Sequence, residues 1–176
     1  MKLIIASDIH GSLKYTKLLE KIIIHENPDK IILLGDLYYH GPRNPLPEEY
    51  NCMGVAEILN KYSDKIIAVQ GNCDAEVDQM ISNFKINQNS IELNVNNNKF
   101  ILSHGHHLNE QTLSNNYIYL VGHTHIYNLD NNIINPGSIS LPKENKEHTC
   151  LLYQDNTFIL IDITNNNKIK IRSLDE

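Results

Sequence analysis

Tryptophan is absent from this 176-residue chain, and aromatic residues make up only 7% of it. Cysteine is scarce as well: Cys52, Cys73 and Cys150 are odd in number, widely spaced and without a CxxC pair. This usage argues against a disulfide framework or a thiolate zinc site and favours a reducing cytoplasm. No basic leader precedes the apolar start, and no apolar run approaches about 18 residues, so we expect neither a signal peptide nor a membrane span.

The charge balance also excludes a class of partner. Lys and Arg number 15 against 21 Asp and Glu, a formal net charge of -6, which repels a long polyanion and disfavours sequence-independent nucleic-acid binding. Apolar residues make up 41% of the chain, which is ordinary for a globular protein. At this length we expect one domain, residues 1–176, that buries roughly 70% of the surface of its unfolded chain.

Short apolar runs alternate with helix-period segments in the first half. Lys2–Ser7, Lys30–Leu34 and Lys65–Gln70 are rich in Ile, Val and Leu and predict buried strands. Between them, Tyr15–His25 and Glu49–Tyr62 place apolar residues at helical spacing. From about residue 90 the pattern becomes strands joined by Asn-rich turns, which predicts mostly antiparallel β structure. We expect an α/β fold with two packed sheets and outer helices.

Polar residues with metal-binding side chains follow the predicted strands. They are Asp8, His10, Asp36, Asn72, His104, His123 and His125. Ligands of open α/β sheets bind beyond the carboxyl ends of the strands, so these segments can converge on one site. Asp8 and His10 are two apart on a segment expected to be extended, where both reach the same side, and His123 with His125 repeats that spacing.

The ligand types predict the class of metal. Oxygen and imidazole donors without thiolate suit Mn, Fe, Ni or Zn ions, and seven donors fit two ions that share one carboxylate. Taken singly, Asp8, Asp36 and Asn72 are equally well explained as turn or capping residues. Taken with four histidines at the same strand ends, the metal site is the better explanation.

Six short motifs, in order, resemble the calcineurin-like metallophosphoesterase superfamily. They are Asp8-Ile9-His10-Gly11-Ser12, Gly35-Asp36, Gly71-Asn72-Cys73-Asp74, His104-Gly105-His106, Gly122-His123-Thr124-His125 and Asn135-Pro136-Gly137-Ser138. The strings YHGPRNPLPE and GNCDAEVDQM are similar to its small bacterial phosphodiesterase branch. The resemblance covers roughly residues 1–142.

The resemblance implies a four-layer αββα sandwich of two mixed β-sheets flanked by helices. It also implies two divalent ions, commonly manganese, with nickel, iron or zinc as alternatives. Asp8, His10, Asp36 and His125 would hold the first ion, and Asp36, Asn72, His104 and His123 the second, with Asp36 as the bridge.

The general acid departs from the family pattern. Many relatives have His where this chain has Cys73, and a thiol with a pKa of about 8.5 is a poorer acid at neutral pH than imidazole. We therefore consider His106 and Cys73 as catalytic candidates, or substrates with leaving groups that need no strong acid. Arg43 could grip a phosphate through its planar guanidinium, although a solvated loop arginine explains it equally well.

The expected function is metal-dependent hydrolysis of phosphate diesters by a hydroxide that bridges two ions. A phosphomonoesterase, acting on nucleotides or proteins, and a catalytically silent binding scaffold of the same fold are the alternatives. A small phosphate ester is the expected substrate, without long nucleic acid or membrane as a partner. We also expect a cytoplasmic location, and homo-oligomers remain open.

Overall fold

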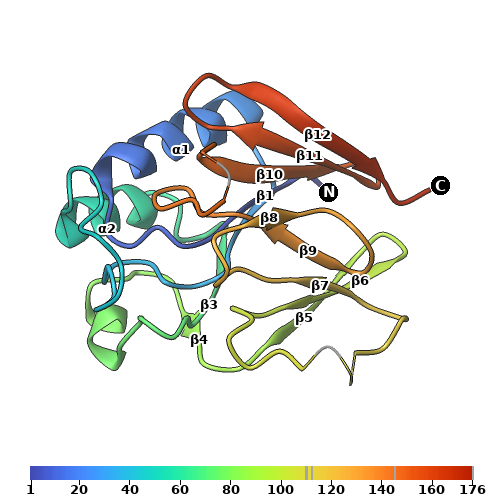
Figure 1. The fold of residues 1–176 in the computed structure, drawn as a ribbon, viewed down its shortest axis with the longest axis horizontal. Helices are drawn as coiled ribbons and strands as arrows, with labels where there is room; N and C mark the ends of the chain where they lie inside the picture. The colour runs from blue at the N-terminus through green and yellow to red at the C-terminus, as the bar shows by residue number, and fades with distance from the viewer. Residues whose placement is uncertain (110, 112, 145, 176) are drawn as a thin grey trace.

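The computed structural model describes residues 1–109, 111, 113–144 and 146–175. A seven-stranded mixed sheet forms from β1 (Leu3–Ala6), β2 (Lys30–Leu33), β3 (Ile66–Val69), β4 (Ile86–Asn87), β10 (Thr149–Gln154), β11 (Thr157–Asp162) and β12 (Asn167–Ser173). Its order is β12-β11-β10-β1-β2-β3-β4 (Figure 1). Strands β1 to β4 pair in parallel, and β10 joins them antiparallel to β1. The three predicted N-terminal strands are therefore confirmed, each slightly shorter than expected.

A five-stranded sheet forms from the middle of the chain. It consists of β5 (Ile91–Val95), β6 (Asn98–Leu102), β7 (Ile118–Leu120), β8 (Tyr127–Asn128) and β9 (Ile133–Pro136), in the order β5-β6-β7-β9-β8. The prediction of mostly antiparallel pairing is wrong for its centre, because β7 runs parallel to both β6 and β9. Parallel β6 and β7 bring their carboxyl ends together at one edge, and the segments that follow them enter the site there.

Two α-helices cover one face of the seven-stranded sheet. Helix α1 (Leu13–Glu26) begins after Ser12, whose side chain accepts a hydrogen bond from the Tyr15 N–H, and ends at Asn27 in the left-handed conformation. Helix α2 (Cys52–Asn60) begins after Asn51, which accepts from the Gly54 N–H. The cap at Asn51 explains why α2 starts later than the hydrophobic pattern predicts.

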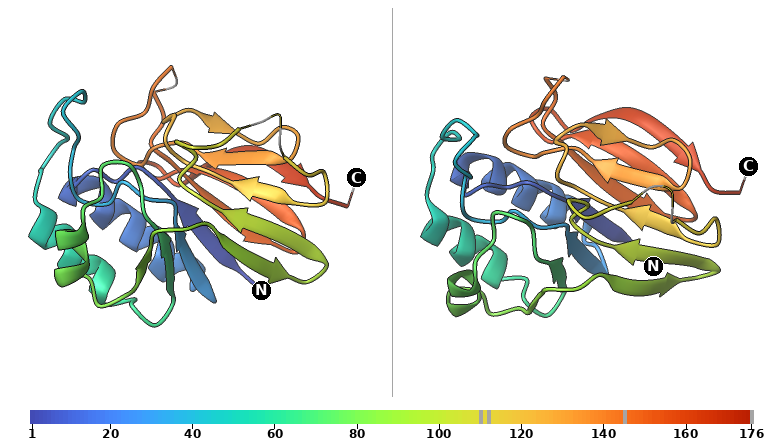
Figure 2. Two further views of the ribbon diagram at one scale, coloured as in Figure 1. Left: turned by 90° about the horizontal axis from the view of Figure 1, so that it is seen from below. Right: turned by 60° about the horizontal axis from the view of Figure 1, so that its bottom comes forward.

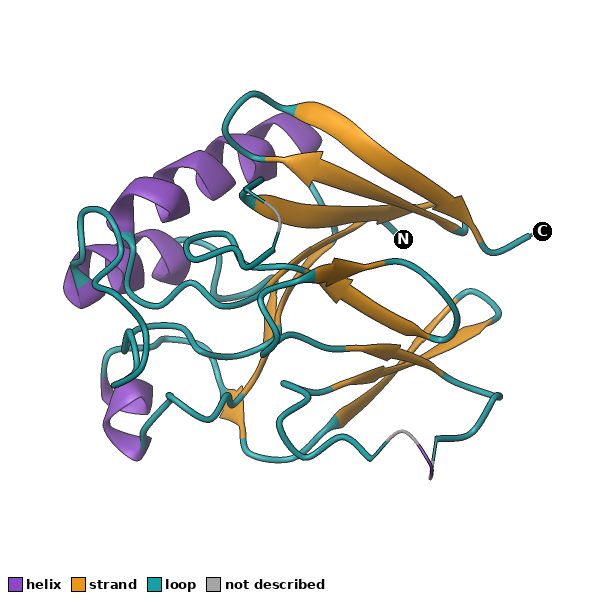
Figure 3. Cartoon of the chain, in the orientation of Figure 1, coloured by secondary structure: helices purple, strands orange, loops and turns teal. Residues whose placement is uncertain are grey.

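Alternating side chains of the central strands form two cores. Ile4 and Ala6 of β1 face the helices, while Leu3 and Ile5 face the five-stranded sheet. The expected two packed sheets with flanking helices are confirmed. In the described part of the chain both α-helices lie on the same face of the seven-stranded sheet (Figure 3). The five-stranded sheet contributes Ile101 and Tyr119 to a pocket that residues 103–109 and Leu113 also line.

The Asn-rich segments form turns, as predicted. Asn96, Asn131, Asn156 and Asn166 have positive φ angles between 54° and 61°, a conformation that asparagine tolerates better than most residues. Views from two other directions show the hairpin turn between β5 and β6 at the end of the sandwich near the C-terminus and the long loop after β2 at the opposite end (Figure 2). None of the helices in the described ranges combines the length and apolar character that crossing a bilayer requires.

Candidate metal centre

The predicted ligand residues meet at one edge of the two sheets. Asp8, Asp36 and Asn72 lie beyond the ends of parallel strands β1, β2 and β3, and His104 follows β6. His123 and His125 follow β7. Backbone hydrogen bonds connect these loops; for example, the Asp8 N–H donates to the Gly35 carbonyl at 3.1 Å. The convergence expected from the strand order is thus a property of the fold.

The backbone at these positions is left-handed, so the prediction of extended segments is wrong. Asp8 and His10 have φ angles of 56° and 50°, Asp36 of 55°, and His123 and His125 of 68° and 62°. Non-glycine residues seldom adopt positive φ, and such residues cluster where the surrounding structure holds a functional geometry. Side chains two positions apart reach the same place because the chain curls around the site.

Three of the histidines have a fixed ring orientation. The Nδ1 atom of His10 lies 2.8 Å from the Tyr39 carbonyl oxygen, that of His104 2.7 Å from the Leu34 carbonyl oxygen, and that of His125 2.7 Å from the Leu141 carbonyl oxygen. A carbonyl only accepts, so each Nδ1 carries the hydrogen. Each ring, when it is neutral, therefore turns an Nε2 lone pair into the site, which is the arrangement of metal-binding histidines.

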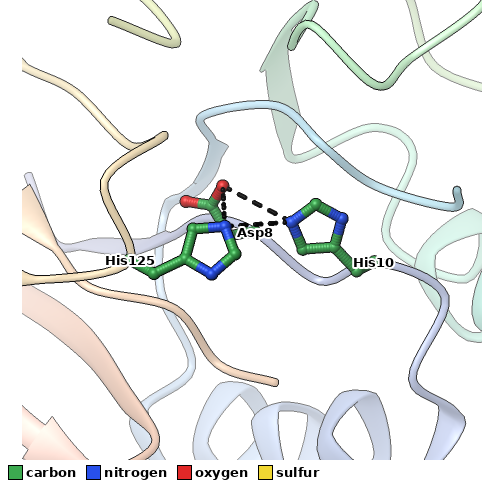
Figure 4. A group of neighbouring side chains, drawn as sticks. All are labelled: Asp8, His10 and His125. Carbon is green, nitrogen blue, oxygen red and sulfur yellow. Dashed lines mark hydrogen bonds and ion pairs between the residues drawn. The ribbon is translucent and has the colours of Figure 1, made fainter. Parts of the chain in front are cut away.

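Asp8, His10 and His125 form one half of the site (Figure 4). The Asp8 Oδ1 atom lies 3.3 Å from His125 Nε2 and 3.8 Å from His10 Nε2. The two Nε2 atoms are 3.1 Å apart. All three side chains are almost completely buried.

Asp36 lies between this half and a second group. Its Oδ2 atom is 3.7 Å from His10 Nε2 and 3.3 Å from His104 Nε2. The exposed Asn72 places its Oδ1 atom 3.0 Å from His104 Nε2. The ring centroid of His123 lies 5.1 Å from that of His104. Asp36 thus lies between the imidazoles of His10 and His104, and its bridging role stays a prediction.

The donor set fits a divalent cation. Asp8 Oδ1 is buried and, within the described residues, has no hydrogen-bond partner, a costly state for a carboxylate oxygen. Facing Nε2 lone pairs of His10 and His125 repel each other unless a proton or a cation lies between them. A hard or borderline ion with oxygen and imidazole ligands would relieve both penalties.

The charges of the donors are strongly coupled. Burial alone would raise the pKa of Asp36, but its hydrogen bond to His104 and the charge of that ring outweigh burial and lower it to about 2. Burial lowers the pKa of His104, yet Asp36 and Asp8 raise it in balance to about 9. The carboxylates thus stay ionised and attract a cation, while His104 must give up a proton to bind one.

Several supporting residues were not singled out from the sequence. Asp74 accepts hydrogen bonds from the N–H groups of Asp36, Leu37 and Gly71 at 2.6–2.8 Å. It thereby ties the loop after β2 to the loop after β3. Its place in the Gly71–Asp74 motif is the only signal in the sequence, because hydrogen bonds to backbone leave no periodic pattern.

The segment Asn135–Ser138 shapes the site. Ser138 and Ser140 both donate to the Asp8 carbonyl, at 2.7 and 2.9 Å. Asn135 donates to the carbonyl of Gly122 at 2.7 Å. These bonds hold the left-handed turn at Asp8 and the backbone ahead of His123, so residues 135–140 support the loops that carry the donors.

Two glycines allow the loops to approach closely. A Cβ atom at Gly71 would lie 2.1 Å from Asp36 Oδ1, and one at Gly122 would lie 1.9 Å from Ser7 Oγ and 2.9 Å from Asp8 Oδ2. Real Cβ atoms do not come so close, so any larger residue would displace a donor.

The catalytic candidates lie around the donors. Cys73 is half-buried, with its sulfur grouped with His10 and Asp36, and burial together with the Asp36 carboxylate raises its pKa to about 12. His106 is exposed, its ring centroid 5.4 Å from that of His104. Burial and the neighbouring ring of His104 lower its pKa. Arg43 is exposed on the loop between β2 and α2, and its predicted contact with substrate stays a prediction.

A pocket of about 400 Å³ opens beside the donors. His104, His106 and His107 line it, together with residues that include Val69, Ile101 and Tyr119. The donors Asp8, His10, Asp36 and His125 do not line it. The pocket therefore lies next to the donor cluster and meets it at His104.

Comparison with protein families gives a match over most of the chain. The model of the calcineurin-like phosphoesterase superfamily domain matches residues 1–157. The curated protein named phosphodiesterase YfcE, from Escherichia coli strain K12, is 41% identical over 150 residues, which cover 81% of this chain and 82% of that protein. The matched residues include every predicted metal ligand.

Solved structures show the same architecture. A phosphoesterase Yfce structure from E. coli has a TM-score of 0.91 at 35% identity and covers 99% of this chain and 100% of that chain. Wild-type Vps29 from Entamoeba histolytica, described in complex with zinc, has a TM-score of 0.59 at 15% identity, covering 98% and 97% of the two chains. At that identity the second likeness concerns the fold alone.

Proposed function

The chain belongs to the calcineurin-like phosphoesterase superfamily and is a metal-dependent phosphoesterase, and from this premise we propose that it hydrolyses phosphate diesters at a two-ion centre. Asp8, His10, Asp36 and His125 hold the first ion, and Asp36, Asn72, His104 and His123 hold the second. Manganese is the proposed metal. The named activity of the 41% identical relative supports a diester as substrate.

The observation that carries the proposal is the position of Asp36. Its Oδ2 atom lies within 3.7 Å of both His10 Nε2 and His104 Nε2, which belong to different halves of the site. A shared anionic ligand is what two neighbouring ions require. Two ions bound there would lower the pKa of water and neutralise charge on the phosphate.

The protein's own groups prepare the site for this chemistry. Carbonyl oxygens hold the Nδ1–H groups of His10, His104 and His125, so the lone pairs at Nε2 cannot rotate away. The Cys73 N–H donates to Asp36 Oδ1 at 2.8 Å, and the His123 N–H donates to Asp8 Oδ2 at 3.0 Å. One oxygen of each carboxylate is thereby fixed to backbone, and the other is directed at the metal position.

Neither candidate acid is tuned for neutral pH. The pKa of Cys73, about 12, makes the thiol a weak proton donor, and the lowered pKa of His106 leaves its ring mostly neutral at pH 7. The best catalytic acid has a pKa near the working pH. We therefore expect the enzyme to prefer diesters whose leaving group is itself acidic, such as a phenol.

The pocket chemistry favours a diester over a monoester. The described residues that line the pocket beside His104 include apolar side chains such as Val69 and Ile101 and no lysine or arginine, so the pocket suits an organic group of a diester better than a charged oxygen of a monoester. The test is hydrolysis of bis(p-nitrophenyl) phosphate and p-nitrophenyl phosphate by metal-stripped protein, before and after manganese is added. Manganese-dependent cleavage of the diester supports the proposal, and preference for the monoester would replace it with a phosphomonoesterase.

A further inference from the structure

The pocket beside His104 is lined largely by residues that metal binding does not require. Its wall includes the apolar side chains of Val69, Ile101 and Leu108 and the ring of Tyr119. Phe100 and Leu102, on either side of Ile101, point into the core between the sheets. Ile101 therefore faces outward, and without an occupant in the pocket its apolar side chain would meet water.

One rim of the pocket is polar and uncharged. The loop between β4 and β5 contributes Gln88, Asn89 and Ser90, and all three are exposed. Within the described residues, these three side chains make no hydrogen bond to protein. Amide and hydroxyl groups are thus available to donate to and accept from a bound molecule.

The described lining carries no lysine, arginine, aspartate or glutamate. Its only titratable groups besides Tyr119 are the imidazoles of His104, His106 and His107, and His104 Nε2 already faces Asp36 Oδ2 at 3.3 Å. A group with its own phosphate or carboxylate would be desolvated there without a free counter-charge, which is unfavourable. The neighbouring pocket along the same rim differs, because Glu76 and Lys85 line it.

The volume and chemistry together select a ligand class. A space of about 400 Å³ is within the range of small-molecule sites. Apolar walls suit the face of a planar ring, and free amides suit the donors and acceptors at the edge of a nucleobase. Because His104 belongs to both the pocket and the donor cluster, a group in the pocket lies beside the phosphate position.

We propose that this pocket binds one organic arm of the diester and that it selects a nucleoside-like arm, an uncharged ring system with hydrogen-bonding edges, over an arm that bears a second anionic group. The inference rests on the proposed diesterase function for the identity of the bound ester. The pocket itself is formed by this chain's own side chains, so binding of the arm alone can be measured without any metal.

The first measurement is a titration of the metal-free protein with adenosine, in which binding is detected by NMR as changes in backbone amide chemical shifts. Saturable shifts at Gln88, Asn89 and Leu108 are expected. Asn89→Ala should weaken binding about three- to tenfold, as expected for loss of a neutral hydrogen bond. Asn94→Ala is the matched control, because Asn94 is an exposed asparagine of β5 outside the pocket. Adenosine that leaves the pocket resonances unmoved, or that binds Asn89→Ala and wild type equally, overturns the proposal.

The second measurement compares two diesters that share the same leaving group, p-nitrophenol. Thymidine 5′-(p-nitrophenyl) phosphate should exceed methyl p-nitrophenyl phosphate in kcat/KM, and the ratio should fall about three- to tenfold in Asn89→Ala. Equal kcat/KM for the two esters, or an equal fall on both in the variant, contradicts the pocket proposal while leaving the diesterase intact. If the protein binds adenosine but hydrolyses neither ester in the presence of manganese, the proposed function is overturned and the proposed nucleoside binding in the pocket is retained.

Discussion

Among single residues, the proposed two-ion centre depends most on Asp36. Its carboxylate faces His10 on one side and His104 on the other, so its removal takes an anionic ligand from both ions. We expect Asp36→Ala to bind no manganese firmly and to lose diester hydrolysis by at least about 100-fold, the upper end for ligand-shell losses. His123→Ala should retain about one ion per chain. Metal analysis after gel filtration measures both.

The exposed aspartate Asp64 provides the control for these variants, since Asp64→Ala removes a carboxylate away from the site. It should keep the full metal content and activity. Asp36→Ala protein that still holds two manganese ions would contradict the bridging assignment.

The raised pKa of His104 makes metal binding depend on pH. At a pKa of about 9, the ring of the metal-free protein holds a proton at pH 7, and the metal must displace it from Nε2. Affinity should therefore rise with pH by about tenfold per unit for this one proton, and level off above about pH 9. Calorimetry of manganese binding in buffers with different ionisation enthalpies reports the proton released; release of none at pH 7 would refute the assignment.

At the element scale, the loops after the strands are held by close backbone contacts. Gly122→Ala places a Cβ atom 1.9 Å from Ser7 Oγ and 2.9 Å from Asp8 Oδ2, so the loop after β7 must move away from Asp8. We expect a loss of about 1–3 kcal/mol in the free energy of unfolding and weaker metal binding. Urea unfolding and manganese titration measure these effects. Adding Ser7→Ala should restore part of the stability, and a fully stable Gly122→Ala protein would show that this loop is looser than described.

Asp74 connects two further loops. Its carboxylate oxygens accept hydrogen bonds from the N–H groups of Asp36, Leu37 and Gly71. In the Asp74→Asn variant an NH₂ group replaces one of these oxygens, so at least one backbone N–H would lose its acceptor. A buried unsatisfied donor costs about 1–3 kcal/mol. We expect a lower urea midpoint and a weaker affinity for manganese, with a nearly unchanged circular dichroism spectrum. An unchanged metal affinity would mean that Asp74 does not position Asp36.

Sequence patterns predicted the strands and the polar side chains that meet beyond their ends, because apolar runs and polar residues at their ends are local signals; that these side chains bind metal stays a prediction. The left-handed backbone at Asp8, His10, Asp36, His123 and His125 was missed, since it is imposed by hydrogen bonds from distant residues such as Ser138 and Ser140. Parallel pairing of β6 with β7 was missed for the same reason. Strand partners depend on contacts far apart in the chain, which no window of residues contains.

At the scale of the whole molecule, the proposed metal ligands come from segments spread from residue 8 to residue 125. The donors lie in five separate loops, so only the folded chain presents them together. Ions that bind only the folded state add about 2.7 kcal/mol at 100 times the dissociation constant. For a protein of this size that corresponds to an increase of about 5–10 °C in Tm. Calorimetry with manganese and after chelation should show this increase in wild type and its absence in Asp36→Ala; equal increases in both would indicate binding elsewhere.

In this fold, the residues proposed to bind metal and the pocket proposed to select the substrate lie in different parts of the molecule. The metal centre is buried at the edge shared by the two sheets, while the pocket that begins at His104 is formed by the outer side of the five-stranded sheet and the loop between β4 and β5. Changes in that loop can alter the substrate without disturbing the donors. A single domain, a cytoplasmic location and a homo-oligomer stay predictions from the sequence.

Activity as a function of metal equivalents tests the two-ion centre directly. Metal-stripped protein is titrated with manganese while hydrolysis of bis(p-nitrophenyl) phosphate is followed. We expect no activity without metal and a rise that is complete at two equivalents per chain. Full activity at one equivalent, or activity in the stripped protein, would contradict a two-ion phosphodiesterase.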